Sequence, residues 1–214
     1  MLNLNEEQNL FQAGYKLIGA IDEAGRGPLA GPVVAACVLI SDGCMMKNKE
    51  LKNIKDSKKL TAKKREELYD VILEEFNEVG IGICDQQTID KINILQASFL
   101  AMKKAISSLK ERPDFIILDG GFPIPNFSLK QKNIIKGDAK VFSIAAASII
   151  AKVTRDRIMN EMHEKYPQYG FKEHKGYGTR QHFECLRMYG PCPIHRLSFK
   201  PVKNILNNNN NAMK

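Results

Sequence analysis

An apolar run that ends in two adjacent acidic residues constrains this chain more than any other feature of its sequence. Residues 17–21 have the character of a buried strand, and Asp22 and Glu23 follow directly, before a glycine-flanked arginine at residues 25–27. Two carboxylates at the mouth of a buried strand are costly unless something compensates their charge. A divalent metal is the usual compensation, because it prefers hard oxygen ligands. The alternative is a strand that ends in a solvated Asp–Glu pair before a turn.

Two more predicted strands also end in acidic residues. The apolar run that begins at Phe115 ends in Asp119, and a short strand over residues 134–138 ends in Asp138. Ligands of open α/β sheets gather at the carboxyl ends of strands, so we expect these two acids to lie near Asp22. An acidic cluster of this kind suits Mg²⁺ or Mn²⁺. Two such ions about 3.5–4 Å apart can assist the in-line displacement of a phosphoryl group.

One condition applies to the acidic pair. Successive side chains of a strand point to opposite faces of the sheet. Asp22 and Glu23 can therefore serve one site only if the backbone turns at Glu23. The glycines that follow favour such a turn, because glycine adopts backbone conformations that other residues avoid.

The pattern of apolar residues predicts an α/β fold with a mixed central sheet of about five strands flanked by helices. We expect strands near residues 16–22, 33–40, 81–84, 115–121 and 134–138. We expect helices over residues 88–110, 143–165 and 179–188, and one after Thr61 with an apolar face at Leu68, Ile72, Phe76 and Val79. Residues 1–14 are expected to form a tail or short helix, residues 15–190 one domain, and residues 191–214 an irregular extension, disordered from about residue 206.

The composition favours polyanionic partners and a reducing compartment. Lys and Arg number 32 against 24 Asp and Glu, a net charge of +8, which suits nucleic acid, acidic lipid or phosphorylated ligands. Five scattered cysteines without a Cys-x-x-Cys pair are expected to be reduced, so we expect a cytoplasmic protein without a zinc site. No apolar run reaches the roughly 18 residues of a membrane span, and the first residues do not resemble a signal peptide.

The segments that carry these residues resemble bacterial ribonuclease HII, of the type 2 ribonuclease H family, over about residues 16–203. The motifs are DEAGRGPLAGPVV at 22–34, DSKKL at 56–60, IDKINIL at 89–95, LDG at 118–120, KGD at 136–138, SIAAASIIAKVTRD at 143–156, YPQYGF at 166–171 and HKGYGT at 174–179. The resemblance implies a catalytic domain with a ribonuclease H-like fold. It implies a metal-dependent endonuclease that hydrolyses the RNA strand of RNA–DNA hybrids and cuts 5′ to ribonucleotides embedded in duplex DNA. The ends would be a 3′-hydroxyl and a 5′-phosphate.

The same resemblance assigns catalysis and metal binding to four acidic residues, with Mg²⁺ or Mn²⁺ as the cofactor. These residues are Asp22, Glu23, Asp119 and Asp138. Asp156 competes for the fourth position. It follows Lys152 by four residues in a predicted helix, where an ion pair is the ordinary explanation, and we favour that explanation.

Substrate recognition is assigned in the same way. The resemblance places Gly25, Arg26 and Gly27 at the 2′-hydroxyl of the ribonucleotide, the group that distinguishes RNA from DNA. It places Tyr177 against the neighbouring deoxyribose, where the ring would sense an RNA-to-DNA junction.

Four further candidates for substrate contact have equally strong structural explanations. Lys58 and the lysines around it form either a phosphate track or a solvated face. Ser148 and Lys152 lie four residues apart on a buried helix, so they either face the site or are a packing serine and a surface lysine. His174 lies close to Tyr177 in the sequence and is also a candidate.

The histidines have no metal-ligand spacing among them. For His174, His182 and His195, surface or loop positions are the default expectation.

Two other functions remain as alternatives. A nuclease of the same fold that acts on DNA junctions, or a strand-transfer enzyme, is disfavoured by the motif at residues 25–27 and by the lack of extra DNA-binding domains. A nucleic-acid binder with a degenerate site is disfavoured because all four acidic residues are present. The expected partners are RNA–DNA hybrids and ribonucleotide-containing duplex DNA. We expect a monomer, and no sequence feature supports a replication clamp as a partner.

Overall fold

Five strands form one mixed sheet in the computed structural model, which describes residues 2, 4–42, 49–54, 57, 60–76 and 78–212. The strands are β1 (Leu17–Ala24), β2 (Val33–Ser41), β3 (Glu78–Cys84), β4 (Phe115–Asp119) and β5 (Lys130–Ile134). Their order across the sheet is β3-β2-β1-β4-β5. β2 runs antiparallel to β1 and β3, whereas β4 runs parallel to β1 and β5. The carboxyl ends of β1 and β4 therefore meet at one edge of the sheet.

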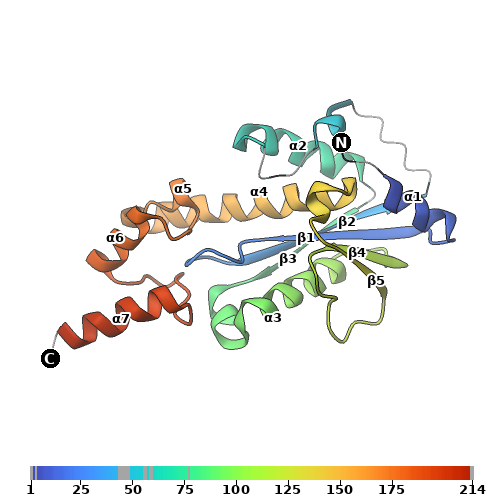
Figure 1. The fold of residues 1–214 in the computed structure, drawn as a ribbon. Coiled ribbons are helices and arrows are strands. Elements are labelled where there is room, and N and C mark those ends of the chain that lie inside the picture. Colours follow the sequence, from blue (N-terminus) through green and yellow to red (C-terminus); the bar gives the residue numbers. More distant parts are fainter. Residues whose placement is uncertain are drawn as a thin grey trace.

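Helices cover both faces of this sheet (Figure 1). They are α1 (Asn5–Gln12), α2 (Ala62–Glu75), α3 (Gln86–Ser107), α4 (Phe142–Lys165), α5 (Phe171–His174), α6 (Arg180–Tyr189) and α7 (Lys200–Ala212), with 3₁₀ turns η1 (Lys49–Asn53), η3 (Gly137–Ala139) and η4 (Pro167–Tyr169). α4 lies along one face against β1 and β2, and α2 packs on α4. α3 covers the opposite face, and α5, α6 and α7 form one end of the molecule.

The middle of the sheet is buried on both sides. One apolar cluster joins Ile18 and Ala20 to α2 and α4, and a second joins Ile21 and Val33 to α3. Burial on both faces explains why β1 and β2 read as continuous apolar runs. The first half of α4 is also buried all round. This part of the helix therefore packs firmly beside the carboxyl end of β1.

The fifth strand lies at residues 130–134, and the expectation of a strand at 134–138 was wrong. β5 is an edge strand whose residues alternate between exposed and half-buried positions, so no apolar run marks it in the sequence. Asp138 lies instead in the turn η3, which follows Lys136 with a left-handed φ of 58°.

Two helices also differ from the expectation. α2 ends at Glu75, so Val79 belongs to β3 and not to the apolar face of the helix. α3 is broken at Asn93, whose φ and ψ are 66° and 165°. The Asn93 side chain accepts hydrogen bonds from the N–H groups of Leu95 and Gln96 at 3.0 and 3.1 Å. It therefore acts as the N-cap of the long second part of α3.

The C-terminal segment contains a helix where an irregular extension was expected. α7 buries Val202 in a third apolar cluster, together with Met159 of α4 and Leu186 of α6. At the other terminus, the buried carboxylate of Glu7 in α1 accepts a hydrogen bond from the Ser143 N–H at 3.0 Å. Both terminal helices are thus attached to α4.

Two further findings concern the length of the helices and the cysteines. No helix within the described ranges is both long and apolar enough to cross a bilayer. The four cysteines that the structure describes are all free.

Candidate active site

Three aspartates from separate segments meet at the carboxyl ends of β1 and β4. One carboxylate oxygen from each of Asp22, Asp119 and Asp138 lies within 4.8 Å of the other two. Asp22 is in β1, Asp119 ends β4, and Asp138 lies in η3. The Asp119 carboxylate accepts the Gly137 N–H at 2.7 Å, which ties η3 to the end of β4. The strand-end acids are therefore brought together as the sequence suggested, although the third comes from a turn.

The electrostatics of this cluster favour a bound cation. Burial raises the pKa of Asp22 well above its ordinary value, and the charges of Glu23 and Asp119 raise it further, while the Ser148 hydroxyl opposes the shift by hydrogen bonding. Burial also raises the pKa of Glu23, and Arg26 opposes that shift. Because carboxylates this close repel one another and offer only hard oxygen ligands, the site fits a divalent metal ion.

Glu23 reaches the same cleft without a turn in the chain. β1 continues through Glu23 to Ala24 and stays paired with β2, so the expectation that the backbone must turn at Glu23 was wrong. The pairing of β1 with β4 ends earlier, at Ile21. Glu23 therefore lies beyond the paired part of β4, where it lines the cleft, and its charge interacts with that of Asp119.

Three of the acidic residues, Asp22, Glu23 and Asp119, line a cleft of about 260 Å³. β1 and the loop after it, the end of β4, one side of α4 and the turn before α6 all contribute to its walls. The lining residues are Asp22, Glu23, Ala24, Gly25, Arg26, Gly27, Ser57, Asp119, Ser148, Lys152, Arg155 and Tyr177. The candidates Gly25, Arg26, Gly27, Tyr177, Ser148 and Lys152 are thus brought together with the acids.

Glycine occupies two positions of the loop, residues 25 and 27, for different structural reasons. Gly25 has a φ of 99°, and an added Cβ would overlap the Arg155 side chain and lie 2.7 Å from the Pro32 oxygen. At Gly27, an added Cβ would lie 3.6 Å from the Tyr177 ring, an ordinary contact distance. Gly25 is therefore required by the fold, whereas Gly27 keeps open the space in front of Tyr177.

Two buried arginines hold this loop in place. Arg196 donates to the carbonyl oxygens of Gly25 at 2.6 Å and Arg26 at 3.0 Å. In a trans peptide the carbonyl and the N–H of the same unit point in opposite directions, so the N–H groups of Arg26 and Gly27 point away from Arg196. Arg155 donates to the carbonyl of Pro32 from the other side at 3.0 Å.

Sequence reasoning missed both arginines. Burial lowers the pKa of Arg155 to about 10 and that of Arg196 to about 9, so both stay charged at neutral pH. Arg155 follows Ser148 and Lys152 by seven and three residues, and this helical spacing was an available signal. Arg196 had no such signal, because its acceptors are backbone carbonyls far away in the sequence.

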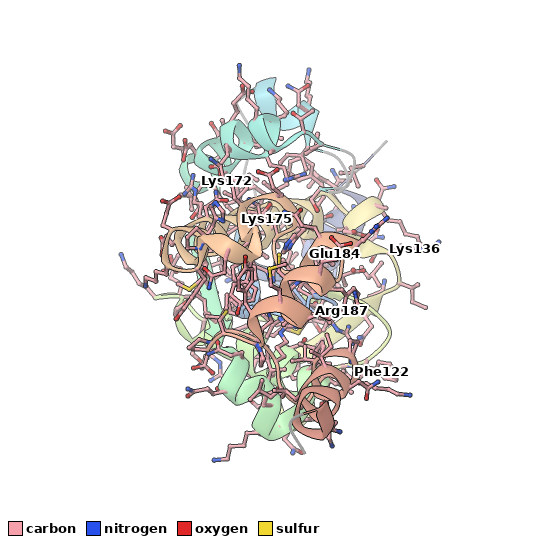
Figure 2. The ribbon with its side chains drawn as sticks, turned by 90° about the vertical axis from the view of Figure 1, so that its left-hand side faces the viewer. Phe122, Lys136, Lys172, Lys175, Glu184 and Arg187 are labelled. Atoms are coloured by element: carbon pink, nitrogen blue, oxygen red, sulfur yellow. The ribbon has the colours of Figure 1, made fainter. Side chains whose placement is uncertain are left out.

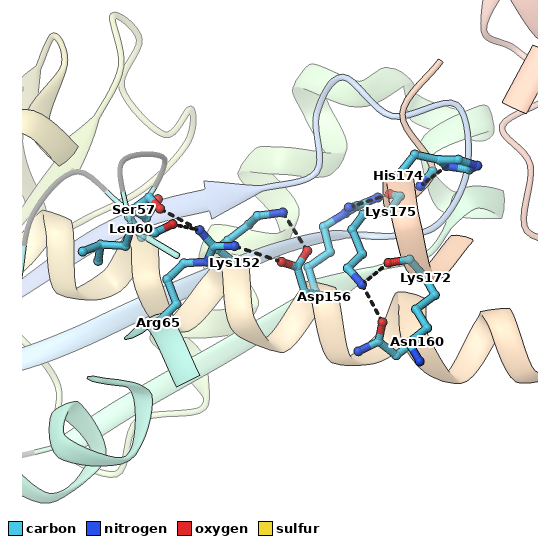
Figure 3. A network of polar contacts seen from close by, with 12 residues as sticks. Ser57, Leu60, Arg65, Lys152, Asp156, Asn160, Lys172, His174 and Lys175 are labelled. Carbon is cyan, nitrogen blue, oxygen red and sulfur yellow. Dashed lines mark hydrogen bonds and ion pairs between the residues drawn. The ribbon is translucent and has the colours of Figure 1, made fainter. Parts of the chain in front are cut away.

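A polar network runs along α4 beside the cleft (Figure 3). Ser57 and Ser148 share a hydrogen bond of 2.9 Å between their hydroxyls. Lys152 Nζ lies 2.6 Å from an Asp156 carboxylate oxygen, and Arg65 lies 3.7 Å from the other. Asp156 thus forms the ion pair that we favoured, and it lies outside the cluster of three aspartates.

The other two candidates for substrate contact are His174 and Lys58. His174 is buried and does not line the cleft; its ring contacts the Tyr169 carbonyl at 2.8 Å and the Gly176 N–H at 3.2 Å. Lys58 lies outside the described residues. The expectation of surface positions was wrong, because three histidines are buried: His174, His182 and His195. His195 does lie in a loop, between α6 and α7, whereas the other two are in helices.

A model of the ribonuclease HII family matches residues 18–202 of this chain. Ribonuclease HII of Acetivibrio thermocellus is 55% identical over 193 residues, which cover 90% of this chain and 73% of that protein. Ribonuclease HII of Caldicellulosiruptor bescii is 50% identical over 212 residues, which cover 96% and 99%.

Solved structures share the fold. Ribonuclease H2 of Pyrococcus horikoshii has a TM-score of 0.71 at 28% identity, covering 90% of this chain and 98% of that one. Ribonuclease HII of Archaeoglobus fulgidus, solved as a complex with PCNA, has a TM-score of 0.72 at 29% identity, covering 88% and 96%. The fold is ribonuclease H-like, as the sequence suggested. This chain belongs to the ribonuclease HII family, whose members are hydrolases that act as ribonucleases H on RNA–DNA hybrids.

Proposed function

We propose that the chain hydrolyses the RNA strand of RNA–DNA hybrids and also cuts 5′ to single ribonucleotides embedded in duplex DNA, with two bound Mg²⁺ or Mn²⁺ ions. One observation carries this proposal: Asp22 and Asp119, two of the three clustered aspartates, line the same cleft as the loop at residues 25–27 and Tyr177. Acidic residues suited to metal-assisted hydrolysis thus lie next to residues that could contact the sugar of a nucleotide. Removal of ribonucleotides from DNA is the repair role that such an activity serves.

The acidic residues would hold the metal. Asp22, Asp119 and Asp138 supply the clustered oxygens, and Glu23 lines the same cleft as a fourth carboxylate. When bound, divalent cations would neutralise these carboxylates and supply Lewis-acid stabilisation for an in-line displacement by water, which leaves a 3′-hydroxyl and a 5′-phosphate.

Residues of α4 orient the site and supply positive charge. The Ser148 hydroxyl hydrogen-bonds to the Asp22 carboxylate and is itself held by Ser57. Lys152 lines the cleft and is paired with Asp156, while burial lowers its pKa. A cation that is already largely buried is suited to a phosphate at the mouth of the cleft.

The loop and the tyrosine read the sugars. Arg196 turns the N–H groups of Arg26 and Gly27 away from itself, which makes them available to a ribose hydroxyl. Tyr177 is 45% exposed, and it faces Gly27 across the open space described above. A deoxyribose against this ring fits, whereas a ribose would bring an additional hydroxyl against it.

Positive charge on the end of the molecule suits the phosphates of a duplex. Figure 2 looks onto the end formed by α5, α6 and α7, with Lys172 and Lys175 on one side of it and Arg187 near its centre. Lys136, from the segment before η3, appears at the opposite side of the same view. We propose that these cations extend the contact with nucleic acid beyond the cleft.

The test is a cleavage assay on matched duplexes with Mg²⁺ or Mn²⁺. One duplex carries a single ribonucleotide, one is all DNA, and one is an RNA–DNA hybrid. We expect a cut on the 5′ side of the single ribonucleotide, cleavage of the hybrid, no cleavage of all-DNA duplex, and loss of both activities in Asp22→Asn. Asp156→Asn is the matched control, and it should keep measurable activity because Asp156 lies outside the cluster.

The other outcomes separate the alternatives. Cleavage of all-DNA junctions would support a junction nuclease, and binding without cleavage under either metal would support a degenerate binder. Size-exclusion chromatography with light scattering tests the expected monomer. A monomer in the cytoplasm remains a prediction, and the sequence leaves a clamp partner open without supporting one.

A further inference from the structure

Two buried histidines form a hydrogen-bonded pair next to Tyr177, and neither of them lines the cleft. His182 is in α6 and His195 lies in the segment before α7, and both are almost fully buried. Their Nε2 atoms are 2.9 Å apart. The pair therefore shares one hydrogen bond, in which one ring must donate and the other must accept.

The backbone around the pair decides which ring donates. His182 Nδ1 lies 2.9 Å from the Tyr177 carbonyl oxygen, which can only accept, so Nδ1 carries the proton of this ring. In a neutral ring Nε2 is then an acceptor, and His195 Nε2 must be the donor. His195 Nδ1 in turn accepts the Cys192 N–H at 2.9 Å, a shorter contact than the 3.2 Å that separates it from the Cys192 carbonyl oxygen. The protons run in one direction, from Cys192 to Tyr177.

The surroundings keep both rings neutral. Burial lowers the pKa of His182 and of His195 to about 4 in each case. The titratable group that faces the pair from α5 is His174, which stacks on His182 with ring centroids 4.5 Å apart. Tyr169 from η4 lies against His195, at a centroid distance of 5.0 Å. Protonation of either ring would place two N–H groups against each other or against the Cys192 N–H.

The segment that contains His195 also binds the loop at residues 25–27, which lies opposite Tyr177 in the cleft. His195 forms a β-bridge with Ala30, and the next residue, Arg196, donates to the carbonyls of Gly25 and Arg26. One short segment is thus hydrogen-bonded to the loop at residues 25–27 and, through His182, to the carbonyl of Tyr177.

We propose that His182 and His195 are positioning residues that set the separation between Tyr177 and the loop at residues 25–27, and thereby the preference for a ribonucleotide followed by deoxyribose. This inference rests on the proposed function, because it concerns the selectivity of the same cleft. Neither histidine touches substrate. A change in the hydrogen bond between them moves the tyrosine, and an active-site displacement of about 1 Å can cost on the order of a hundredfold in rate.

The first test compares two substitutions of one residue. His195→Leu removes the donor to His182, whereas His195→Gln keeps an N–H close to the position of Nε2 and is the conservative control. For each protein, kcat/KM is measured on the single-ribonucleotide duplex and on a continuous RNA–DNA hybrid. We expect the ratio of the two values to fall about tenfold in His195→Leu and to stay near that of the parent chain in His195→Gln. An unchanged ratio in His195→Leu overturns the inference.

The second test needs no substitution. In the parent chain labelled with ¹⁵N-histidine, NMR at pH 7 should show His182 protonated at Nδ1, His195 protonated at Nε2, and a coupling between the two Nε2 nuclei across the hydrogen bond. Identical tautomers or a charged ring would overturn the inference even if His195→Leu failed to fold. Failure of the proposed function looks different, because the parent chain would then not cut the single-ribonucleotide duplex at all.

Discussion

Asp22 is a carboxylate whose surroundings disfavour its charge in the absence of metal. It is 5% exposed, and burial together with Glu23 and Asp119 raises its pKa. Asn at this position keeps acceptors for the Ser148 hydroxyl and for the Glu23 N–H, which lies 2.7 Å from the Asp22 carboxylate. Asp22→Asn should therefore abolish cleavage and raise the melting temperature of the metal-free protein. Thermal unfolding in EDTA measures the second effect.

Asp156→Asn is the control substitution, and its effect on the melting temperature should be opposite to that of Asp22→Asn. Asp156 is paired with Lys152 and Arg65, so neutralising it leaves two partly buried cations without their partner and should lower the melting temperature. If both substitutions lowered the melting temperature equally, the acidic cluster would not be a source of strain in the metal-free protein.

The two glycines of the cleft loop should separate stability from recognition. Gly25→Ala places a side chain at a φ of 99° and against Arg155, so it should cost at least about 2 kcal/mol of unfolding free energy. Gly27→Ala meets an ordinary contact with Tyr177 and should change stability by less than about 0.5 kcal/mol. It narrows the space for a sugar, so kcat/KM on the single-ribonucleotide duplex should fall about tenfold or more. Urea unfolding and steady-state kinetics measure the pair, and a destabilised Gly27→Ala with normal kinetics would contradict this assignment.

At the scale of helices and strands, the sequence predicted the bounds of an element well where the element is buried on all sides. α4 begins within one residue of its expected start and ends at the expected Lys165, because an apolar surface all round followed by Tyr166-Pro167 leaves little choice. β5 was misplaced because an edge strand with one exposed face carries no apolar run. α7 was missed because its apolar contact, Val202, fills a space that only the packing of α4 and α6 creates.

The candidate site divides in the same way. The gathering of Asp22, Asp119 and Asp138 could be expected, because each follows or ends a predicted element at the sheet edge. The supports of the site were harder to predict, because Arg155 and Arg196 bind backbone carbonyls, and any residue type offers such an acceptor. Arg155 left one signal, its helical spacing from Ser148 and Lys152, whereas Arg196 left none.

The end of the molecule that contains α6 should lose stability in acid. His182 and His195 have folded pKa values of about 4 against an ordinary 6.5. Between these values the unfolded chain binds more protons, so the free energy of unfolding falls as the pH falls from about 6.5 to about 4. The shift corresponds to on the order of 3 kcal/mol for each histidine.

A double variant isolates this contribution. His182→Gln/His195→Gln removes both titrating groups, whereas Asp22 and Glu23, whose raised pKa values act with the opposite sign, are common to both proteins. Chemical unfolding at pH 7 and pH 5 should therefore show a larger loss of stability in the parent chain than in the double variant. An equal loss would mean that the histidines are not neutral in the folded protein.

At the scale of the whole molecule, the net charge of +8 should make duplex binding depend on salt. Counterion release lowers affinity with each phosphate that is contacted, so binding should weaken at least about tenfold between 50 and 200 mM salt. Fluorescence anisotropy with the inactive Asp119→Asn variant measures this without cleavage. Lys172→Gln should reduce the slope by about one, whereas Lys103→Gln, a substitution in α3 on the opposite side of the sheet, should leave it unchanged.

Metal binding should stabilise the whole fold, because it joins elements that pack on different parts of the core. Asp22 belongs to the central strand, Asp119 to its parallel neighbour, and Asp138 to the turn that leads into α4. A metal held by all three binds only the folded chain, so a concentration 100 times its Kd should add about 2.7 kcal/mol to the free energy of unfolding. Differential scanning calorimetry with increasing Mg²⁺ or Mn²⁺ should show a melting temperature that rises with metal concentration. Asp138→Asn should abolish most of this rise, whereas Asp156→Asn should keep it. A rise of equal size in Asp138→Asn would place the metal elsewhere and separate the turn η3 from the chemistry of the cleft.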